Sequence, residues 1–132
     1  MRFIVMLMLL SLCSCYNTSA VRSVTPQEVM GLLRNDFAIL VDVRESEELK
    51  DGMAQGAIWM PTSKIESDEN AWREFVSKLS KAKEIIFYCA AGVRAEKVAK
   101  KLASLGFKTA NMGGFSDWVK TGLPIHYQMT SF

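Results

Sequence analysis

The chain has 132 residues, with 16 Lys and Arg against 14 Asp and Glu, so its formal net charge is +2. This length suits one domain, and the near balance of charge argues against a nucleic-acid partner, which selects a basic surface. Apolar residues make up 49% and charged residues 23%, which excludes a disordered chain and a polytopic membrane protein. With three cysteines, no CxxC pair and one histidine, the ligands for a structural zinc site are lacking. We therefore expect neither a metal nor another cofactor.

The first twenty residues have the pattern of an export signal. Arg2 precedes an apolar run over residues 3–12, which is shorter than the about 20 residues of a membrane-spanning helix but suits a signal peptide. The sequence LCSC over residues 12–15 resembles a bacterial lipobox, so we expect Cys15 to be lipidated. Cleavage after Ala20 and a buried N-terminal segment are the alternatives.

This reading places the folded domain in a bacterial envelope. A lipid on Cys15 would hold it at a membrane, facing the periplasm, and Tyr16 favours the outer membrane because it is not the Asp associated with inner-membrane retention. Cleavage after Ala20 would instead give a soluble periplasmic or secreted form. Either route leaves Cys89 as the lone thiol of the domain, where it cannot form an internal disulfide. The expected organisation is a signal and tether over residues 1–20, a folded domain over 21–126 and a tail over 127–132.

From residue 21 onward, amphipathic stretches alternate with short apolar runs. Thr25, Pro26 and Glu28 form a helix start, and this helix is predicted to end at Arg34. Further helices are predicted over residues 45–50, 71–79, 94–105 and 115–120, strands over 38–43, 57–60, 85–88 and 108–112, and a loop over 65–70. Strands that alternate with helices at this spacing predict an α/β fold, with a central parallel sheet of about five strands flanked by helices.

The loop between the strand over residues 85–88 and the helix from Arg94 carries the candidate chemistry. Its sequence over residues 89–94 is CAAGVR. In open parallel sheets, sites form at the carboxyl ends of strands, where a helix N-terminus offers free N–H groups and a partial positive charge. Small residues and Gly92 let the amides converge on one point, so that a Cys89 thiolate is stabilised there with help from Arg94. A core cysteine that caps the strand is the alternative that spacing alone leaves open.

Four segments resemble the rhodanese homology domain in order and spacing. They are VDVRE at 41–45, GMAQGAIWMP at 52–61, CAAGVR at 89–94 and GGFSDW at 113–118, and the match spans nearly all of 22–125. The resemblance implies the rhodanese α/β fold and sulfur transfer through a persulfide on Cys89. It also implies a persulfide-binding loop and a supporting pair beside it. The loop residues are Ala90, Ala91, Gly92, Val93 and Arg94, and the supporting residues are Asp42 and Arg44.

The chain departs from the family pattern near the site. Met53 stands where many members have His, and Ala90, Ala91 and Ala95 stand where many have basic or hydroxyl side chains. The loop amides would still hold the persulfide sulfur, but Arg94 is the side chain left to bind a charged donor. We expect small sulfur compounds as substrates of a monomer. The donor is thiosulfate or a persulfide, and the acceptor is cyanide or a thiol, including a protein thiol.

Two other functions are compatible with this fold. Phosphatases and arsenate reductases of the same fold place a longer stretch between cysteine and arginine, enough to wrap a tetrahedral oxyanion, whereas this chain has four residues there. A non-catalytic docking module at the envelope would explain the alanine-rich loop, although an intact Cys89 argues against it. Trp72 and Trp118 are expected in the core. Trp59 is expected there too, with the mouth of the site as its alternative position, and His126 is expected at the surface.

Overall fold

The computed structural model describes residues 21–128, which form seven strands and six helical segments. The strands are β1 (Arg22–Ser23), β2 (Ala38–Asp42), β3 (Met53–Ala54), β4 (Ile58–Trp59), β5 (Glu84–Cys89), β6 (Thr109–Gly114) and β7 (Ile125–His126). The helices are α1 (Pro26–Arg34), α2 (Thr62–Ser67), α3 (Glu69–Ser77), α4 (Val93–Ala103), α5 (Phe115–Lys120) and the 3-10 helix η1 (Ser46–Asp51). The expected export signal with Cys15, and residues 129–132, lie outside the described residues.

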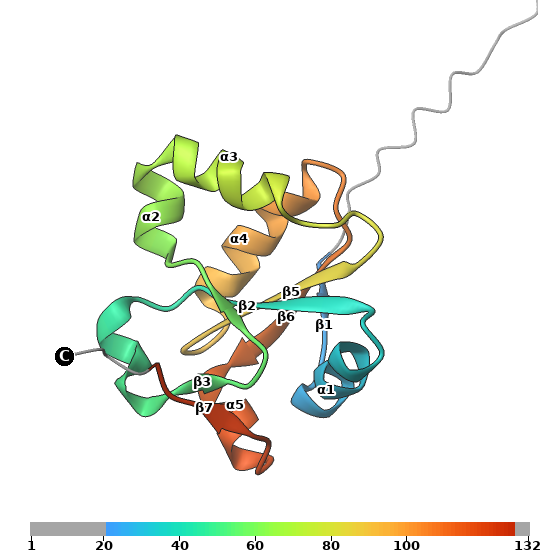
Figure 1. Ribbon diagram of the computed structural model, residues 1–132, viewed down its shortest axis with the longest axis vertical. Helices are drawn as coiled ribbons and strands as arrows, with labels where there is room; N and C mark the ends of the chain where they lie inside the picture. Colours follow the sequence, from blue (N-terminus) through green and yellow to red (C-terminus); the bar gives the residue numbers. More distant parts are fainter. Residues whose placement is uncertain (1–20, 129–132) are drawn as a thin grey trace, which may run out of the picture.

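Five of the strands form one parallel sheet in the order β1-β6-β5-β2-β4, and β3 pairs with β7 in a separate antiparallel ribbon. Figure 1 shows α2, α3 and α4 on one side of the sheet and α1 and α5 on the other. The expected α/β fold, a central parallel sheet of five strands flanked by helices, is confirmed. Because the strands are parallel, their carboxyl ends meet at one edge of the sheet, and Cys89 lies there at the end of β5.

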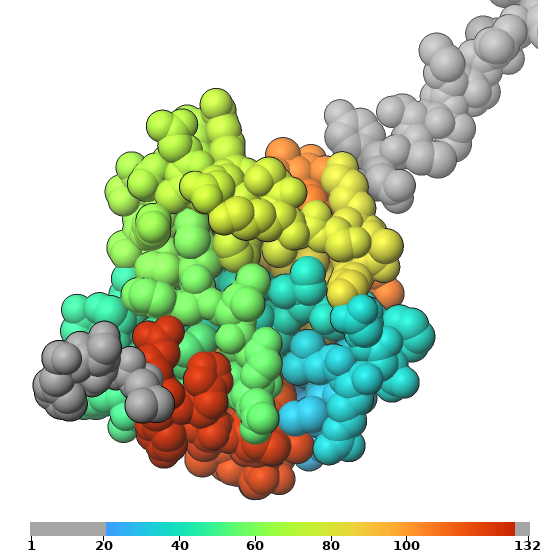
Figure 2. Space-filling view, viewed as in Figure 1, coloured from blue at the N-terminus to red at the C-terminus, as the bar shows by residue number. Residues whose placement is uncertain are grey.

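The central strands β2 and β5 are apolar on both faces because helices cover both faces. Alternate side chains therefore enter two separate clusters. The cluster beneath α2, α3 and α4 includes Val41, Val43, Trp72, Ile85, Phe87 and Val98. The cluster against α1 and α5 includes Val29, Leu40, Ile86, Tyr88 and Trp118. Figure 2 shows the side chains of α2 and α3 over the upper part of the visible face, with the green segment that contains β4 running beneath them.

The segment predicted as a loop over residues 65–70 is mostly helical. α2 and α3 together occupy it, and Asp68 is the one residue between them. The Asp68 carboxylate accepts a hydrogen bond from the Ala71 amide (2.9 Å) and so caps α3. The polar sequence gave no helical pattern because α2 buries only Thr62 and Ile65 and exposes its other side chains.

One expected side-chain position is wrong, and three short strands were not expected. Trp59 is 37% exposed instead of lying in the core, and its indole N–H donates to the Arg44 carbonyl (2.8 Å). His126 lies in β7, opposite Met53 of β3, and is partly exposed at the surface. The strands β1, β3 and β7 have two residues each, which is too short for an alternation of apolar and polar residues to reveal.

A buried carboxylate ties β1 to the rest of the sheet. Arg22 of β1 donates to both carboxylate oxygens of Glu84 at the start of β5 (2.6 and 2.8 Å). The Glu84 side chain is only 3% exposed. The hydrogen bonds from Arg22 lower the pKa of Glu84 below its ordinary value of 4.5.

We expect the Glu84 carboxylate to stabilise the fold above about pH 4.5 and to lose that contribution as the pH falls further. A lowered pKa means that the unfolded chain binds the proton first, so protonation favours unfolding. Glu84→Gln should lower the free energy of unfolding at pH 7 by roughly 1.5–3 kcal/mol, the range for hydrogen bonds to charged groups. Urea titrations at pH 7 and at pH 3 measure both effects.

The difference between the wild type and Glu84→Gln should shrink toward pH 3, and a constant difference would contradict this account. Glu74→Gln is the matched control. Glu74 pairs with Lys78 one helical turn away, but both side chains are about 70% exposed, so its loss should leave the free energy of unfolding at pH 7 nearly unchanged.

Candidate active site

The Cys89 thiol lies at the carboxyl edge of the sheet and at the beginning of a helix. Cys89 is the last residue of β5, it is 1% exposed, and its sulfur is not in a disulfide. Its Sγ accepts a hydrogen bond from the amide of Gly92 (3.0 Å). Helix α4 begins at the next residue, Val93, so the sulfur lies near the positive end of the α4 dipole. Such a position favours a negative charge on sulfur.

The loop over residues 89–94 takes its curled shape from backbone geometry. Gly92 has φ +98°, a left-handed conformation that residues with a side chain rarely adopt. The carbonyl of Gly92 accepts a hydrogen bond from the side chain of Asn111 on β6 (3.0 Å). Val93, by contrast, is 79% exposed. The loop is therefore fixed by contacts to its backbone, whereas the side chains of Ala90, Ala91 and Val93 are exposed.

Arg94 is engaged by a carboxylate that the sequence did not single out. Its two terminal nitrogens donate to the two carboxylate oxygens of Glu48 in η1 (2.7 and 2.8 Å). The hydrogen bonds from Arg94 lower the pKa of Glu48 to about 2. The pairing with Glu48 raises the pKa of Arg94, and the charge of Cys89 adds to this effect. The charge of the guanidinium is therefore balanced by Glu48.

Asp42 and Arg44, expected beside the loop, form a buried ion pair, and the hydroxyl of Tyr88 donates a hydrogen bond to it. Asp42 accepts hydrogen bonds from the guanidinium of Arg44 (2.7 Å) and from the hydroxyl of Tyr88 (2.6 Å), and all three residues are buried. The Tyr88 hydroxyl in turn accepts from the amide of Ala54 in β3 (3.0 Å). Burial raises the pKa of Tyr88, and the charge of Asp42 raises it further, so the hydroxyl keeps its proton as a donor. Tyr88 directly precedes Cys89, and no pattern in the sequence indicated its role.

The Arg44 side chain also fastens two segments around the site. Its guanidinium donates to the carbonyl of Glu48 within η1 (3.1 Å) and to the carbonyl of Gly52, the residue that follows η1 (2.7 Å). It stacks over the ring of Phe115 at the start of α5, 4.0 Å from the ring centroid. Arg44 therefore positions backbone and is fully occupied in doing so.

The glycine pair at the end of β6 allows the backbone to approach the loop. In the β5–β6 register, Gly114 lies opposite Cys89, after an irregularity in the pairing beyond Phe87. A Cβ atom added at Gly114 would lie 2.3 Å from the carbonyl oxygen of Ala90. Only glycine fits at this position without displacing the loop.

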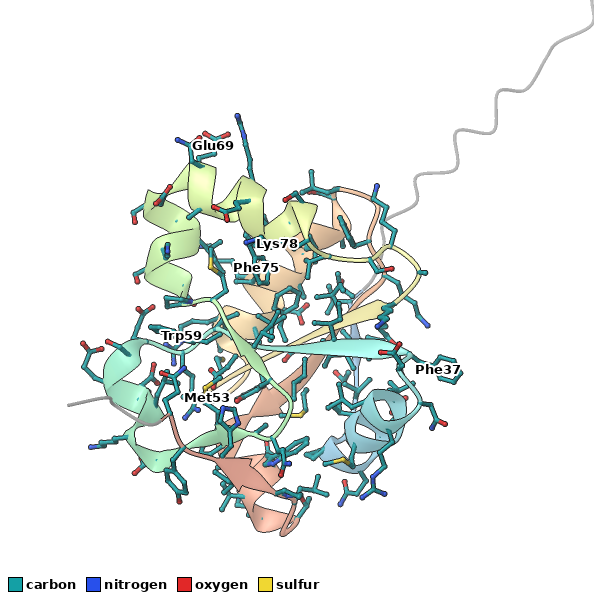
Figure 3. The ribbon with its side chains drawn as sticks, viewed as in Figure 1. Phe37, Met53, Trp59, Glu69, Phe75 and Lys78 are labelled. Carbon is teal, nitrogen blue, oxygen red and sulfur yellow. The ribbon has the colours of Figure 1, made fainter. Side chains whose placement is uncertain are left out.

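Two clefts flank the loop. One, of about 340 Å³, has Ala90 on its wall together with Arg44, Glu47, Glu48, Lys50, Asp51, Phe115 and Ser116. The other, of about 400 Å³, is lined by Ser23, Val24, Ala91, Gly92, Val93, Glu96, Asn111, Met112 and Gly113. Figure 3 shows Met53 and Trp59 near the end of the sheet where β2 stops, and Phe37 at the opposite end. Substrates therefore have room on both sides of the loop.

The described residues contain neither a candidate metal site nor a candidate membrane-spanning helix. Across residues 21–128, no three His, Cys, Asp or Glu side chains gather in a way that could hold a metal ion. In the same part of the chain, every helix is too short or too polar to cross a membrane.

We expect Gly114→Ala to displace the loop and to lower the free energy of unfolding by about 1–3 kcal/mol, as overpacking does. Gly31→Ala is the matched control, because a Cβ at Gly31 of α1 meets no atom within 4 Å. Removing that helical glycine should stabilise the protein by roughly 0.5–1 kcal/mol. Urea unfolding of both variants measures the two shifts, and equal effects would contradict the close approach of Gly114 to Ala90.

Comparison with known proteins agrees with this geometry. The rhodanese-like domain model matches residues 25–121. The thiosulfate sulfurtransferase GlpE of Glaesserella parasuis is 28% identical over 104 residues, which cover 77% of this chain and 90% of that protein. The mouse thiosulfate sulfurtransferase/rhodanese-like domain-containing protein 3 is 34% identical over 116 residues, with 81% of this chain and 74% of that protein covered.

A solved structure has the same fold. The human single-domain sulfurtransferase superposes with a TM-score of 0.62 at 29% identity, over 76% of this chain and 97% of that one. Because the family match covers most of the chain and relatives over this range are named sulfurtransferases, the protein belongs to the rhodanese-like domain family.

Proposed function

We propose that the protein is a sulfurtransferase that carries a sulfane sulfur as a persulfide on Cys89. The observation that carries the proposal is the position of the Cys89 sulfur, which accepts a hydrogen bond from the Gly92 amide at the beginning of α4. Membership of a family with named thiosulfate sulfurtransferases supports the same reaction class.

In the first half-reaction, the Cys89 thiolate attacks the outer sulfur of the donor. A new S–S bond forms to Cys89, and the bond between the outer sulfur and the rest of the donor breaks. The bonding electron pair leaves with that group, which is sulfite when thiosulfate is the donor. Cys89 then bears a persulfide whose terminal sulfur is anionic, and the loop amides of residues 90–94 stabilise this charge.

In the second half-reaction, a nucleophilic acceptor takes the terminal sulfur. A thiolate, cyanide or sulfite attacks that sulfur, and the electron pair of the persulfide bond returns to Cys89 as a thiolate. Both steps pass through one covalent intermediate, so ping-pong kinetics follow. No general base is required, because both nucleophiles react as anions.

We expect the purified protein to gain one sulfur atom on Cys89 when it is incubated with thiosulfate or a persulfide. Cys89→Ser should remove both the mass gain and the transfer of sulfur to cyanide or a thiol, because serine forms no persulfide. Mass spectrometry of the peptide that contains residue 89 locates the added sulfur.

The double variant Cys13→Ser/Cys15→Ser is the control, since it removes the other two thiols of the chain and should keep the mass gain and the activity. Sulfur transfer that survives Cys89→Ser would refute the mechanism. A wild type that takes up no sulfur from any donor would favour a non-catalytic docking module instead.

In the cell, we propose that a lipid on Cys15 holds the domain at the envelope membrane, facing the periplasm. The sequence supports this through the short apolar run over residues 3–12 and the LCSC segment after it. Replacing Cys15 with Ala should move the protein from the membrane fraction to the soluble fraction, because the lipid can no longer be attached. Cell fractionation followed by immunoblotting measures the two pools.

Cys13→Ala is the matched control for Cys15→Ala and should leave the membrane-bound pool unchanged. An undiminished membrane pool in Cys15→Ala would defeat the lipid anchor and leave cleavage after Ala20 as the route that releases the domain.

A further inference from the structure

We propose that Glu48 sets the charge selectivity of the sulfur donor. By neutralising Arg94 beside the Cys89 loop, it makes the site favour sulfane-sulfur donors of low negative charge over dianions such as thiosulfate. This inference rests on the proposed sulfurtransferase function and names the substrate class of the same site.

The first observation is that Glu48 is fixed in place as the partner of Arg94. Both of its carboxylate oxygens accept from the Arg94 guanidinium, and one of them also accepts from the amide of Glu45 (2.8 Å). The two side chains are each 32% exposed, so water screens the pair only in part. A donor that approaches Cys89 therefore meets a balanced pair and not a free cation.

The second observation is that Arg44, the other arginine near the loop, also has its charge balanced by a carboxylate. Arg44 is 3% exposed and pairs with Asp42, which is completely buried. With both arginines balanced, the cleft beside Ala90 is left with the carboxylates of Glu47 and Asp51 against the ammonium of Lys50. Its uncompensated charge is negative.

The second cleft adds no cation. Among the residues that line it, Glu96 is the one charged side chain. Glu96 accepts a hydrogen bond from Asn111 (3.1 Å) and forms an ion pair with Lys100 one helical turn away (3.2 Å), so this cleft offers no free cation. Within the loop, Ala90 and Ala91 offer no side-chain donors. A dianion would be bound by the loop amides alone, against the charge of the surrounding carboxylates.

The chemistry allows charge to be varied while the transferred atom stays the same. Thiosulfate is a dianion, and methanethiosulfonate carries one negative charge with a methyl group in place of one oxygen. In both, the Cys89 thiolate attacks the terminal sulfur, the S–S bond of the donor breaks, and the electron pair leaves with sulfite or with methanesulfinate. The kcat/KM ratio of the two donors therefore reports how the site discriminates by charge, and a change in that ratio between variants cancels their intrinsic reactivity.

The decisive variant is Glu48→Gln in the full-length protein. Gln keeps a carbonyl oxygen that accepts from Arg94 but removes the negative charge, so the guanidinium becomes an uncompensated cation. The ratio of kcat/KM for thiosulfate to kcat/KM for methanethiosulfonate should rise about tenfold, as expected for one added charge-assisted contact. The gain for thiosulfate should shrink as salt is added, because a partly exposed cation is screened.

Glu74→Gln is the matched control, since it removes the same charge and the ion pair with Lys78 (2.8 Å) on α3, and Glu74 lines neither cleft beside the loop. Its ratio should change by about twofold or less. Ala90→Arg is a second test, which adds a cation to the rim while Glu48 stays paired. It should also raise the ratio, and it decides the question of substrate class if Glu48→Gln does not fold.

The outcomes separate the two levels of the proposal. If the wild type transfers sulfur but Glu48→Gln leaves the ratio within twofold of the wild type, the role of Glu48 is refuted while the sulfurtransferase function stands. If Ala90→Arg also leaves the ratio unchanged, the charge of the rim does not select the donor at all. If the wild type takes no sulfur from thiosulfate, methanethiosulfonate or a persulfide, the proposed function itself fails, and the inference fails with it.

Discussion

The buried ion pair between Asp42 and Arg44 is the interaction on which the rest of the site depends. It joins the ends of β2 and β5, because Asp42 also accepts from the hydroxyl of Tyr88, the residue before Cys89. A buried pair of this kind contributes little net stability compared with apolar residues of the same volume, but losing one partner costs about 3–5 kcal/mol. Its main consequence is therefore positional. It fixes the position of the end of β5, and therefore the position of the buried Cys89 sulfur.

The loop itself is supported through its backbone atoms, by contacts with β6. Asn111 holds the carbonyl of Gly92, and Gly114 lets β6 approach the carbonyl of Ala90. An anion at the sulfur is then met by amides and a helix terminus, which exist whatever the side chains of the loop are. This explains how an alanine-rich loop keeps a geometry that suits an anion at the Cys89 sulfur. It also means that the loop side chains are free to set selectivity without disturbing that geometry.

The parts of this arrangement that sequence reasoning predicts are those encoded locally. The parallel sheet follows from apolar runs such as residues 85–88, and the place of Cys89 follows from a strand that gives way to a helix within five residues. The partner of Arg94 is not encoded locally. Glu48 lies 46 positions away in the sequence and contacts Arg94 only when η1 packs beside the start of α4. Trp59 is likewise expected to pack in the core from its apolar character, yet it is partly exposed, with its indole N–H donating to the Arg44 carbonyl. Such contacts depend on tertiary placement and leave no periodic signal.

The balanced charge of Arg94 also bears on the proposed sulfur transfer. In that mechanism both half-reactions share one anionic intermediate, so each increment of free energy that stabilises the persulfide helps its formation and hinders its transfer to the acceptor. A free guanidinium next to the terminal sulfur would deepen that intermediate. The pairing of Arg94 with Glu48 reduces the field of the cation, and the Gly92 amide gives the sulfur a neutral contact. Under the proposed mechanism, such an arrangement would stabilise the persulfide enough for it to form without trapping it.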